Sequence, residues 1–181
     1  MLNLGRMILV QKATAEDMMC IHDMAEIVFR HTYCDMLSAE QIDYMMEWMY
    51  SAESLRRQLD EGHVYYIALR DGVPCGYVSV QPDGLADDGL PLFHLQKIYV
   101  LPSEQGTGLG RVLLETVLEH VRDCVGAGGP EGAVIELNVN RNNPAIGFYH
   151  RFGFQILRQG DFPIGNGYYM NDYIMGLEVR S

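Results

Sequence analysis

The sequence lacks the cysteine pairs and the positive charge that several classes of protein require. Its four cysteines, Cys20, Cys34, Cys75 and Cys124, form no C-x-x-C pair, so neither a zinc site nor a redox motif is indicated and no metal is expected. The formal net charge of −11 disfavours nucleic acid or an anionic membrane as a partner, because both require a basic surface. The acidity is compatible with a cationic substrate, and it is equally common in soluble proteins.

Long apolar runs are also absent: none approaches the roughly 20 residues that span a bilayer. Residues 1–10 are too short and too irregular in order to be a secretory signal, so a cytoplasmic location is expected. A hydrophobic content of 48% with 20% charged residues is typical of a soluble globular protein. The length of 181 residues falls within the range of one domain, and we expect a single domain over 1–181.

The first part of the chain shows helix and strand patterns with clear boundaries. Thr14 has the character of a helix cap, and Ser38 followed by Gln41 forms a capping-box pattern. Asp71-Gly72 is a strong hairpin signal between two strands, which are therefore expected to be antiparallel. The predicted elements are a strand at 7–12, helices at 14–30, from Ser38, and at 51–61, and strands at 63–69 and 75–80.

The second part alternates strands and helices. The predicted elements are an exposed loop at 82–91, a strand at 94–101, a helix at 109–125, a flexible connection at 126–130, a strand at 133–139, a short helix opened by Asn142-Asn143-Pro144 with an Asn cap, a short strand at 154–157 and a long one at 168–179. A helix connects the strands at 94–101 and 133–139, so these two are expected to be parallel. The pattern predicts an α/β fold with one mixed sheet.

Residues 105–110, Gln-Gly-Thr-Gly-Leu-Gly, join a strand to a helix through glycine. Such a turn lets the backbone approach a ligand, and the first amides of the helix favour an anion such as phosphate. A dinucleotide fingerprint would need glycine where the chain has Arg111, and a Walker motif would need Lys with Ser or Thr where the chain has Arg111-Val112. An ordinary glycine-rich turn before a surface helix remains the alternative.

Two motifs carry a resemblance to a known family. Gln105, Gly108 and Gly110 fit Q-x-x-G-x-G, which resembles the acyl-CoA pyrophosphate loop of the GNAT superfamily of N-acetyltransferases. A second stretch resembles the GNAT signature N-x-x-A-x-x-F-Y followed by G-F, matched by Asn142, Ala145, Phe148, Tyr149, Gly153 and Phe154. The resemblance is strong over about 92–157. Residues 94–102 and 44–51 are similar to the polyamine-acetyltransferase-like branch.

This resemblance implies a GNAT fold: one mixed, mostly antiparallel sheet with a central parallel strand-helix-strand unit and flanking helices. It implies transfer of an acetyl group from acetyl-CoA to a primary amine of a small molecule, with a polyamine as one candidate, by direct attack. Two alternatives stay open, a protein or peptide N-acetyltransferase and a non-catalytic acyl-CoA-binding sensor. The resemblance also permits a homodimer.

The resemblance further implies roles for particular residues. The backbone of Ile98, Tyr99 and Val100 would pair with pantetheine and polarise the thioester carbonyl. Asn142 would bind the pantetheine arm; the alternative is a plain helix cap. Tyr149 would protonate the CoA thiolate; the alternative is a core residue. The residues whose amides would hold the pyrophosphate are Gln105, Gly106, Thr107, Gly108, Leu109, Gly110 and Arg111.

The general base is not fixed by the motifs. His94 lies four residues before Ile98, where members of the superfamily can carry a base, and its ordinary pKa near 6.5 suits proton acceptance. No Glu occurs between Pro91 and Ser103. His94 is the candidate base, and the alternatives are water as the base and a strand-start histidine with no catalytic role. Aromatic and acidic residues that could bind an amine cation, or could simply form solvated helix faces, are Tyr33, Trp48, Asp35, Asp43 and Glu47.

Overall fold

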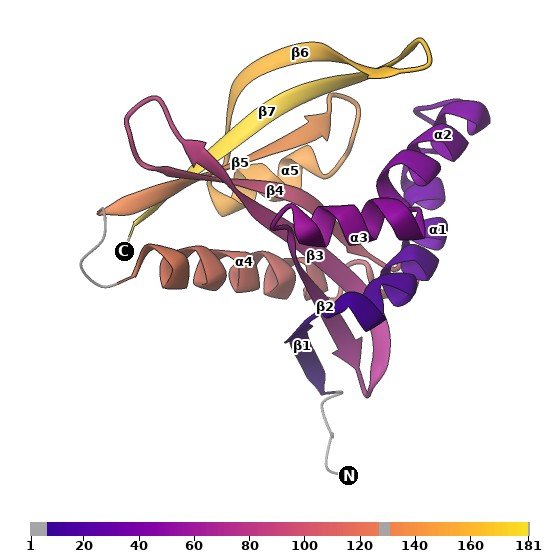
Figure 1. Cartoon of the computed structure of the whole chain (residues 1–181), viewed down its shortest axis with the longest axis horizontal. Helices are drawn as coiled ribbons and strands as arrows, with labels where there is room; N and C mark the ends of the chain where they lie inside the picture. The colour runs from indigo at the N-terminus through magenta and orange to yellow at the C-terminus, as the bar shows by residue number, and fades with distance from the viewer. Residues whose placement is uncertain (1–6, 127–130, 181) are drawn as a thin grey trace. The chain divides into compact units, whose positions relative to one another are not determined.

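Seven strands form one mixed sheet in the order β1-β2-β3-β4-β5-β7-β6 in the computed structural model, which describes residues 7–126 and 131–180 (Figure 1). The pair β4 and β5 is parallel, whereas β1 with β2, β5 with β7 and β6 with β7 are antiparallel. The predicted fold class, a mostly antiparallel mixed sheet with a central parallel strand-helix-strand unit, is confirmed. Most of the connection predicted at 126–130 lies outside the described residues, as do residues 1–6.

The elements follow the predicted order. They are β1 (Ile8–Lys12), η1 (Ala15–Asp17), α1 (Met18–Tyr33), α2 (Ala39–Tyr50), α3 (Ala52–Asp60), β2 (Val64–Arg70), β3 (Val73–Leu85), β4 (Pro91–Val100), η2 (Pro102–Glu104), α4 (Leu109–Val125), β5 (Gly132–Asn140), α5 (Ile146–Phe152), β6 (Gln155–Gly165) and β7 (Tyr168–Arg180). No helix among the described residues is long and apolar enough to cross a membrane.

The chain groups into two compact units by its internal contacts. The first unit comprises Met1–Ser79 and Lys97–Val117, and the second comprises Val80–Gln96 and Leu118–Ser181. Both β3 and β4 continue from one unit into the other. The expectation of a single domain over the whole chain stays a prediction.

Side-chain caps fix the helix starts of the first unit. Asp17 Oδ2 accepts hydrogen bonds from both the amide and the hydroxyl of Thr14, at 2.8 and 3.1 Å, which holds the entry to η1 and α1. Ser38 Oγ accepts from the amide of Gln41 at 3.1 Å and so begins α2 as predicted. Each contact satisfies an amide that has no carbonyl partner one turn earlier in the helix.

The β2–β3 hairpin also follows from local chemistry. Asp71 and Gly72 adopt positive φ angles of 52° and 82°, which is the conformation that a two-residue hairpin turn requires. The register of β1 against β2 pairs Ile8 with Arg70 at the end nearest this turn. The hairpin turn and the pairing with β1 therefore both fix the end of β2.

Two of the strand predictions are too short. β3 extends through Leu85, so the loop predicted at 82–91 is confined to residues 86–90. β6 runs to Gly165 rather than ending near Leu157, and a second hairpin turn follows, with positive φ at Asn166 and Gly167. Most of β6 is exposed, so burial imposes no apolar pattern on its sequence, and its strand conformation depends on pairing with β7.

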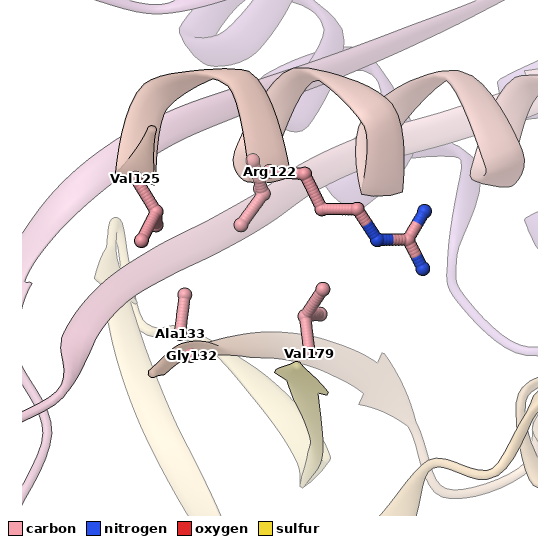
Figure 2. A pocket seen from close by; sticks show the side chains of 6 residues that line it. Arg122, Val125, Gly132, Ala133 and Val179 are labelled. Atoms are coloured by element: carbon pink, nitrogen blue, oxygen red, sulfur yellow. The ribbon is translucent and has the colours of Figure 1, made fainter. Parts of the chain in front are cut away.

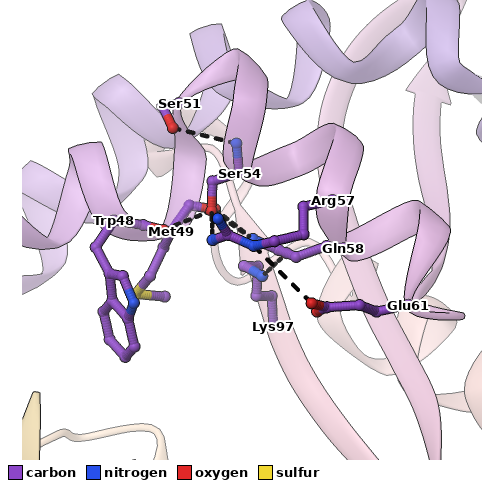
Figure 3. Close-up of polar contacts among 8 residues, drawn as sticks. All are labelled: Trp48, Met49, Ser51, Ser54, Arg57, Gln58, Glu61 and Lys97. Carbon is purple, nitrogen blue, oxygen red and sulfur yellow. Dashed lines mark hydrogen bonds and ion pairs between the residues drawn. The ribbon is translucent and has the colours of Figure 1, made fainter.

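A buried lysine lies in the core of the first unit, beneath α3 (Figure 3). Lys97 Nζ donates to Gln58 Oε1 at 2.7 Å and to the hydroxyl of Tyr65 at 2.9 Å, and it lies 5.5 Å from the ring centre of Tyr50. No ion pair with a carboxylate is described for this ammonium. Burial lowers the pKa of Lys97 from 10.5 to about 7, since the charged form has lost its solvation.

Polar residues of α3 satisfy the last carbonyl groups of α2 (Figure 3). Ser54 Oγ donates to Trp48 O at 2.5 Å, and Gln58 Nε2 donates to Met49 O at 2.8 Å. Gln58 thus joins the C-terminal end of α2 to Lys97. The polar core of this unit is a hydrogen-bonded network rather than a set of isolated groups.

We expect Lys97→Met to change how stability depends on pH. Between about pH 7 and 10.5 the unfolded chain holds a proton on Lys97 that the folded chain has lost, so this residue makes the wild type more stable as pH rises. The stability of Lys97→Met relative to the wild type should therefore fall by up to about 1.4 kcal/mol per pH unit over that range. Urea denaturation from pH 6.5 to 9.5 measures the difference. Lys12→Met, which removes an exposed lysine, is the control, and parallel curves for wild type and Lys97→Met would contradict the prediction.

Candidate active site

The glycine-rich loop lies between η2 and α4. Gly106 and Gly108 have positive φ angles of 77° and 86°, which side-chain-bearing residues rarely adopt. A Cβ at either position would meet nothing within 4 Å, so the backbone conformation rather than lack of space requires glycine. Gln105 is exposed, whereas Leu109 is 1% exposed and anchors the start of α4 in the core.

The amides that follow these glycines lie at the N-terminal end of a long helix. Val112 N donates to Gly108 O at 3.2 Å, so the amides of Leu109 and Gly110 come before the helical hydrogen-bond ladder. α4 is 17 residues long, and the partial positive charge of its dipole is at this end. The loop and the helix start fit a diphosphate group, which glycine-lined helix N-termini bind through their amides.

The side chains of the loop have local partners. Thr107 Oγ1 donates to the carbonyl of Glu104 at 2.6 Å, within the turn. Arg111 is exposed, and its Nε pairs with Glu115 Oε1 one helical turn later at 2.8 Å. Both side chains are exposed, and each has a partner within one turn of the chain.

Ile98, Tyr99 and Val100 form the carboxyl end of β4, beyond the described ladder with β5, which ends at the pair of Leu95 with Leu137. Just after the strand, Leu101 N donates to Cys75 O of β3 at 2.9 Å. Alternate residues of a strand direct their backbone groups to the same neighbour, so those of Tyr99 also face β3. The backbone groups of Ile98 and Val100 face away from β3.

The side chain of Tyr99 belongs to an aromatic cluster of the first unit. Its hydroxyl lies 3.0 Å from that of Tyr33, and its ring centre is 6.2 Å from Phe29 and 5.7 Å from Tyr77. Aromatic packing of this kind fixes the ring orientation. Tyr33 was predicted to line the acceptor pocket, and it therefore lies against Tyr99, whose backbone was predicted to meet the thioester.

The acidic candidates for the acceptor pocket are less well placed. Asp43 Oδ1 forms an ion pair with Arg30 Nη1 at 2.6 Å, so an amine cation would have to compete with a guanidinium. Glu47 on α2 and Asp35 in the turn after α1 are both exposed. Trp48 is 43% exposed on α2 and keeps part of its ring accessible.

His94 lies on β4 in the second unit among charged groups. Its side chain is 18% exposed, and Nδ1 lies 3.9 Å from Asp83 Oδ2. Glu136 is the register partner of His94 on β5, and its carboxylate accepts from both terminal nitrogens of Arg158 at 3.2 and 2.8 Å. Burial lowers the pKa of His94, Asp83 and Glu136 oppose this effect, and Arg158 adds to it.

The candidate pantetheine residue Asn142 does not cap α5. The residue before the helix is Ala145, and the amide of Ala145 donates to Asn143 Oδ1 at 2.9 Å, so Asn143 rather than Asn142 organises this turn. Asn142 is exposed, and its own amide donates to Asn140 Oδ1 at 2.9 Å. The cap alternative for Asn142 is therefore wrong, because the N-cap residue of α5 is Ala145, three residues further along the chain.

Tyr149 lies on α5 and is 7% exposed. Its amide donates to Ala145 O, and its carbonyl accepts from the amide of Phe154, each at 3.1 Å. Its ring centre is 5.4 Å from Phe148 and 5.8 Å from Phe154, so two rings fix its orientation. This packing is typical of a core residue, and it also fixes the direction in which the Tyr149 hydroxyl points.

The candidate residues are therefore gathered within each unit. The first unit holds the loop at 105–110 together with Ile98, Tyr99 and Val100. The second holds His94 beside Glu136, and Asn142 with Tyr149 around the start of α5. Asp83, Glu136 and Arg158 around His94 were not predicted, since nothing local in the sequence distinguishes them from other charged residues.

A small hollow of the second unit is a poor candidate for the active site. It lies at the C-terminal end of α4 and is lined by Val121, Arg122, Val125, Gly132, Ala133 and Val179 (Figure 2). The guanidinium of Arg122 points away from Val125 and Ala133 (Figure 2). The remaining lining is aliphatic and offers no group for a phosphate or an amine. Within 7–126 and 131–180, no group of three or more His, Cys, Asp or Glu could hold a metal ion.

Comparison with known families identifies the class of protein. The model of the Acetyltransferase (GNAT) family matches residues 29–154, which include both the glycine loop and the segment around Tyr149. The chain belongs to this family.

Two curated relatives are similar to part of the chain, and one solved structure is similar to most of it. The L-methionine sulfoximine/L-methionine sulfone acetyltransferase of Salmonella typhimurium is 31% identical over 98 residues, and the L-amino acid N-acyltransferase MnaT of Escherichia coli is 30% identical over 98 residues. Each match covers 54% of this chain and 54% of the relative, so the similarity spans about half the length of these proteins. The crystal structure of the PaiA N-acetyltransferase from Thermoplasma acidophilum in complex with coenzyme A has a TM-score of 0.72 and 21% identity, and covers 94% of this chain and 98% of that one. This likeness shows the shared fold.

Gly108→Glu should abolish acetyl-CoA binding if the glycine-rich loop holds the diphosphate, because it places a side chain and a negative charge on a left-handed residue of that loop. Isothermal titration calorimetry measures the affinity. Gly62→Glu is a matched control in the same unit, with positive φ and nothing within 4 Å of its Cβ. The control should lose comparable stability and keep acetyl-CoA affinity. Unchanged affinity in Gly108→Glu would remove the loop from the binding site.

The pH profile tests His94 as a base. Burial lowers its pKa from the ordinary 6.5, so the acid limb of kcat/KM assigned to His94 should lie below that pH. Asp83 raises this pKa, so Asp83→Asn should move the limb to still lower pH. His94→Gln should remove the limb and lower kcat/KM about 100-fold. Because the acceptor ammonium also titrates, the pH profiles of kcat/KM of the wild type and the variant are measured with the same acceptor, and the difference between the two profiles reports His94. If His94→Gln keeps the wild-type profile, another group or water is the base.

Proposed function

We propose that this chain is an acetyl-CoA-dependent N-acetyltransferase that acetylates a primary amine of a small molecule by direct attack on the thioester. The observation that carries the proposal is the loop at 105–110 in a member of the GNAT family: two left-handed glycines directly before a 17-residue helix. This arrangement presents amides to an anion without a cationic side chain. The pantetheine arm joins the diphosphate of acetyl-CoA covalently to its thioester, so a diphosphate site also limits where the reacting group can lie.

The end of β4 is the proposed thioester site. Ile98 and Val100 have backbone groups that face away from β3, so they can pair with the pantetheine arm and donate to the thioester oxygen as charge develops there. Tyr99 contributes through its side chain, which the aromatic cluster fixes. The side-chain amide of Asn142 has no hydrogen-bond partner among the residues that the structure describes, and we assign it to the pantetheine arm.

Three proton transfers complete the proposed reaction. His94, kept largely neutral by burial, accepts a proton from the attacking ammonium, directly or through water. Tyr149 donates the proton that the departing thiolate needs, and the second proton that the nitrogen loses as it becomes an amide passes, directly or through water, to the phenolate left on Tyr149. The amine nitrogen forms the new bond to the acetyl carbon as the carbon–sulfur bond breaks, so no covalent enzyme intermediate is required.

The curated relatives favour an amino-acid-like acceptor. One is named for L-methionine sulfoximine and L-methionine sulfone, and the other for L-amino acids. We therefore propose an α-amine of a small amino-acid-type molecule as the acceptor, ahead of a polyamine. The ion pair of Asp43 with Arg30 supports this order, because it weakens a carboxylate that could otherwise bind a polycation.

A panel of acceptors tests the proposed function. The assay follows CoA thiol release and the mass of the product with L-methionine sulfoximine, L-methionine sulfone, spermidine and a peptide with a free N-terminus. Acetylation of the two amino-acid analogues above the others supports the proposal. A preference for spermidine or the peptide would overturn the acceptor class, and saturable acetyl-CoA binding with no turnover on any amine would favour a sensor.

Tyr149→Phe should lower kcat by about 100-fold or more on the true acceptor and leave the affinity for acetyl-CoA unchanged, since only the proton donor is lost. Steady-state kinetics and calorimetry measure the two quantities. Tyr65→Phe removes the hydroxyl of another buried tyrosine and should keep kcat within about twofold. An equally small effect in Tyr149→Phe would show that the thiolate is protonated by another donor.

A further inference from the structure

An ion pair connects the end of β2 to the residue directly before the glycine loop. Arg70 Nε donates to Glu104 Oε2 at 2.7 Å, and the two side chains are only 16% and 15% exposed. In each of the other ion pairs described between arginine and a carboxylate, at least one partner is more exposed than both of these. A pair withdrawn from solvent is screened less by salt, and the loss of one partner leaves the other charge uncompensated.

The same guanidinium also reaches into the loop. Arg70 Nη2 lies 3.4 Å from Thr107 Oγ1, and this hydroxyl donates to the carbonyl of Glu104 at 2.6 Å. The amide of Thr107 points to the same carbonyl at 3.3 Å. Arg70 therefore contacts residues on both sides of Gln105-Gly106 and joins them across the turn.

The backbone of Arg70 is well suited to act as an anchor. It is paired with Ile8 in the β1–β2 ladder, and the next residue, Asp71, exchanges hydrogen bonds with Met7, each of 3.0 Å. Gly106, by contrast, is exposed and has the backbone freedom of glycine. A flexible loop loses entropy when it closes on a ligand, and an anchor at its start reduces that loss.

We propose that Arg70, through its ion pair with Glu104 and its contact with Thr107, is a positioning residue that holds the diphosphate loop in its binding conformation. The proposal rests on the proposed function, in that the loop at 105–110 takes the diphosphate of acetyl-CoA. Glu104 neutralises the guanidinium, so Arg70 acts on the loop rather than as a phosphate ligand. Without Arg70, the carboxylate of Glu104 would lie unpaired beside a bound anion and would repel it.

Calorimetry with acetyl-CoA separates these roles. Arg70→Met should weaken acetyl-CoA binding about tenfold or more, because it frees the loop and exposes the charge of Glu104. Glu104→Gln should also weaken binding, by a few-fold, because it loosens the anchor. The double variant Arg70→Met/Glu104→Gln should bind more tightly than Arg70→Met alone, because the unpaired charge is gone. If Arg70 were a direct phosphate ligand, Glu104→Gln would instead strengthen binding by releasing the guanidinium, and that result would overturn the proposal.

Further variants distinguish positioning from a general loss of folding. Arg57→Met, which removes an arginine of α3 that pairs with Glu61, should keep the wild-type affinity for acetyl-CoA. Arg70→Lys should recover part of the loss, since lysine keeps the charge but cannot contact both Glu104 and Thr107 in one plane. Thermal unfolding without ligand identifies variants that fail to fold, and Thr107→Val, a milder change, should then still weaken binding. Wild-type affinity in Thr107→Val and in a folded Arg70→Met would refute the role of Arg70.

The choice of ligand separates this proposal from the function on which it rests. Dephospho-CoA keeps the diphosphate and lacks the 3′-phosphate, so Arg70→Met should lose the same factor of affinity for it as for CoA. A loss confined to CoA would move the effect to the 3′-phosphate and contradict the proposal. If the wild type itself bound neither acetyl-CoA nor dephospho-CoA, the proposed function would fail. If the wild type bound both and Arg70→Met bound equally well, only the role of Arg70 would fail.

Discussion

Two left-handed backbone positions, at Gly106 and Gly108, are the constraint on which the candidate site depends. They allow the chain to leave β4, turn through η2 and enter α4 with its first amides directed outward. The flanking structure is rigid: Leu109 is buried, and Arg70 and Glu104 form an ion pair largely withdrawn from solvent. A ligand would therefore meet a short flexible segment between two fixed points. This is a sound basis for binding a phosphate group by backbone alone.

The parts of the fold that could be predicted from sequence are those with local signals. Ser38 with Gln41 begins a helix because the side chain satisfies a nearby amide, and Asp71-Gly72 makes a hairpin because both residues tolerate positive φ. The bounds of α4 match the predicted helix at 109–125, since its apolar spacing is regular and glycines precede it. The parallel pairing of β4 with β5 followed from the helix between them. The resemblance to the GNAT family then implied chemical roles for residues whose local patterns predicted only the helix, strand or turn in which they lie.

The rest could not be predicted because it depends on partners distant in sequence. The length of β6 follows from pairing with β7, since its exposed residues carry no apolar alternation. Two adjacent asparagines cannot be told apart by type, and in the structure Asn143 rather than Asn142 accepts the hydrogen bond from the amide of Ala145 in the turn before α5. The charges around His94 come from β3, β5 and β6, and Arg70 meets Glu104 across 34 positions. Such pairs have no signature in a single sequence.

The environment of Lys97 has a consequence for the chemistry that the protein itself undergoes. The chain contains two lysines, Lys12 and Lys97. Lys97 is sealed between aromatic rings and an amide, so an acyl donor in solution cannot reach its amine without local unfolding, even though that amine is readily deprotonated. Lys12 at the end of β1 is exposed. If the protein uses acetyl-CoA as proposed, it thus offers a single accessible lysine to self-modification, while the lysine amine that is more readily deprotonated is protected by the fold.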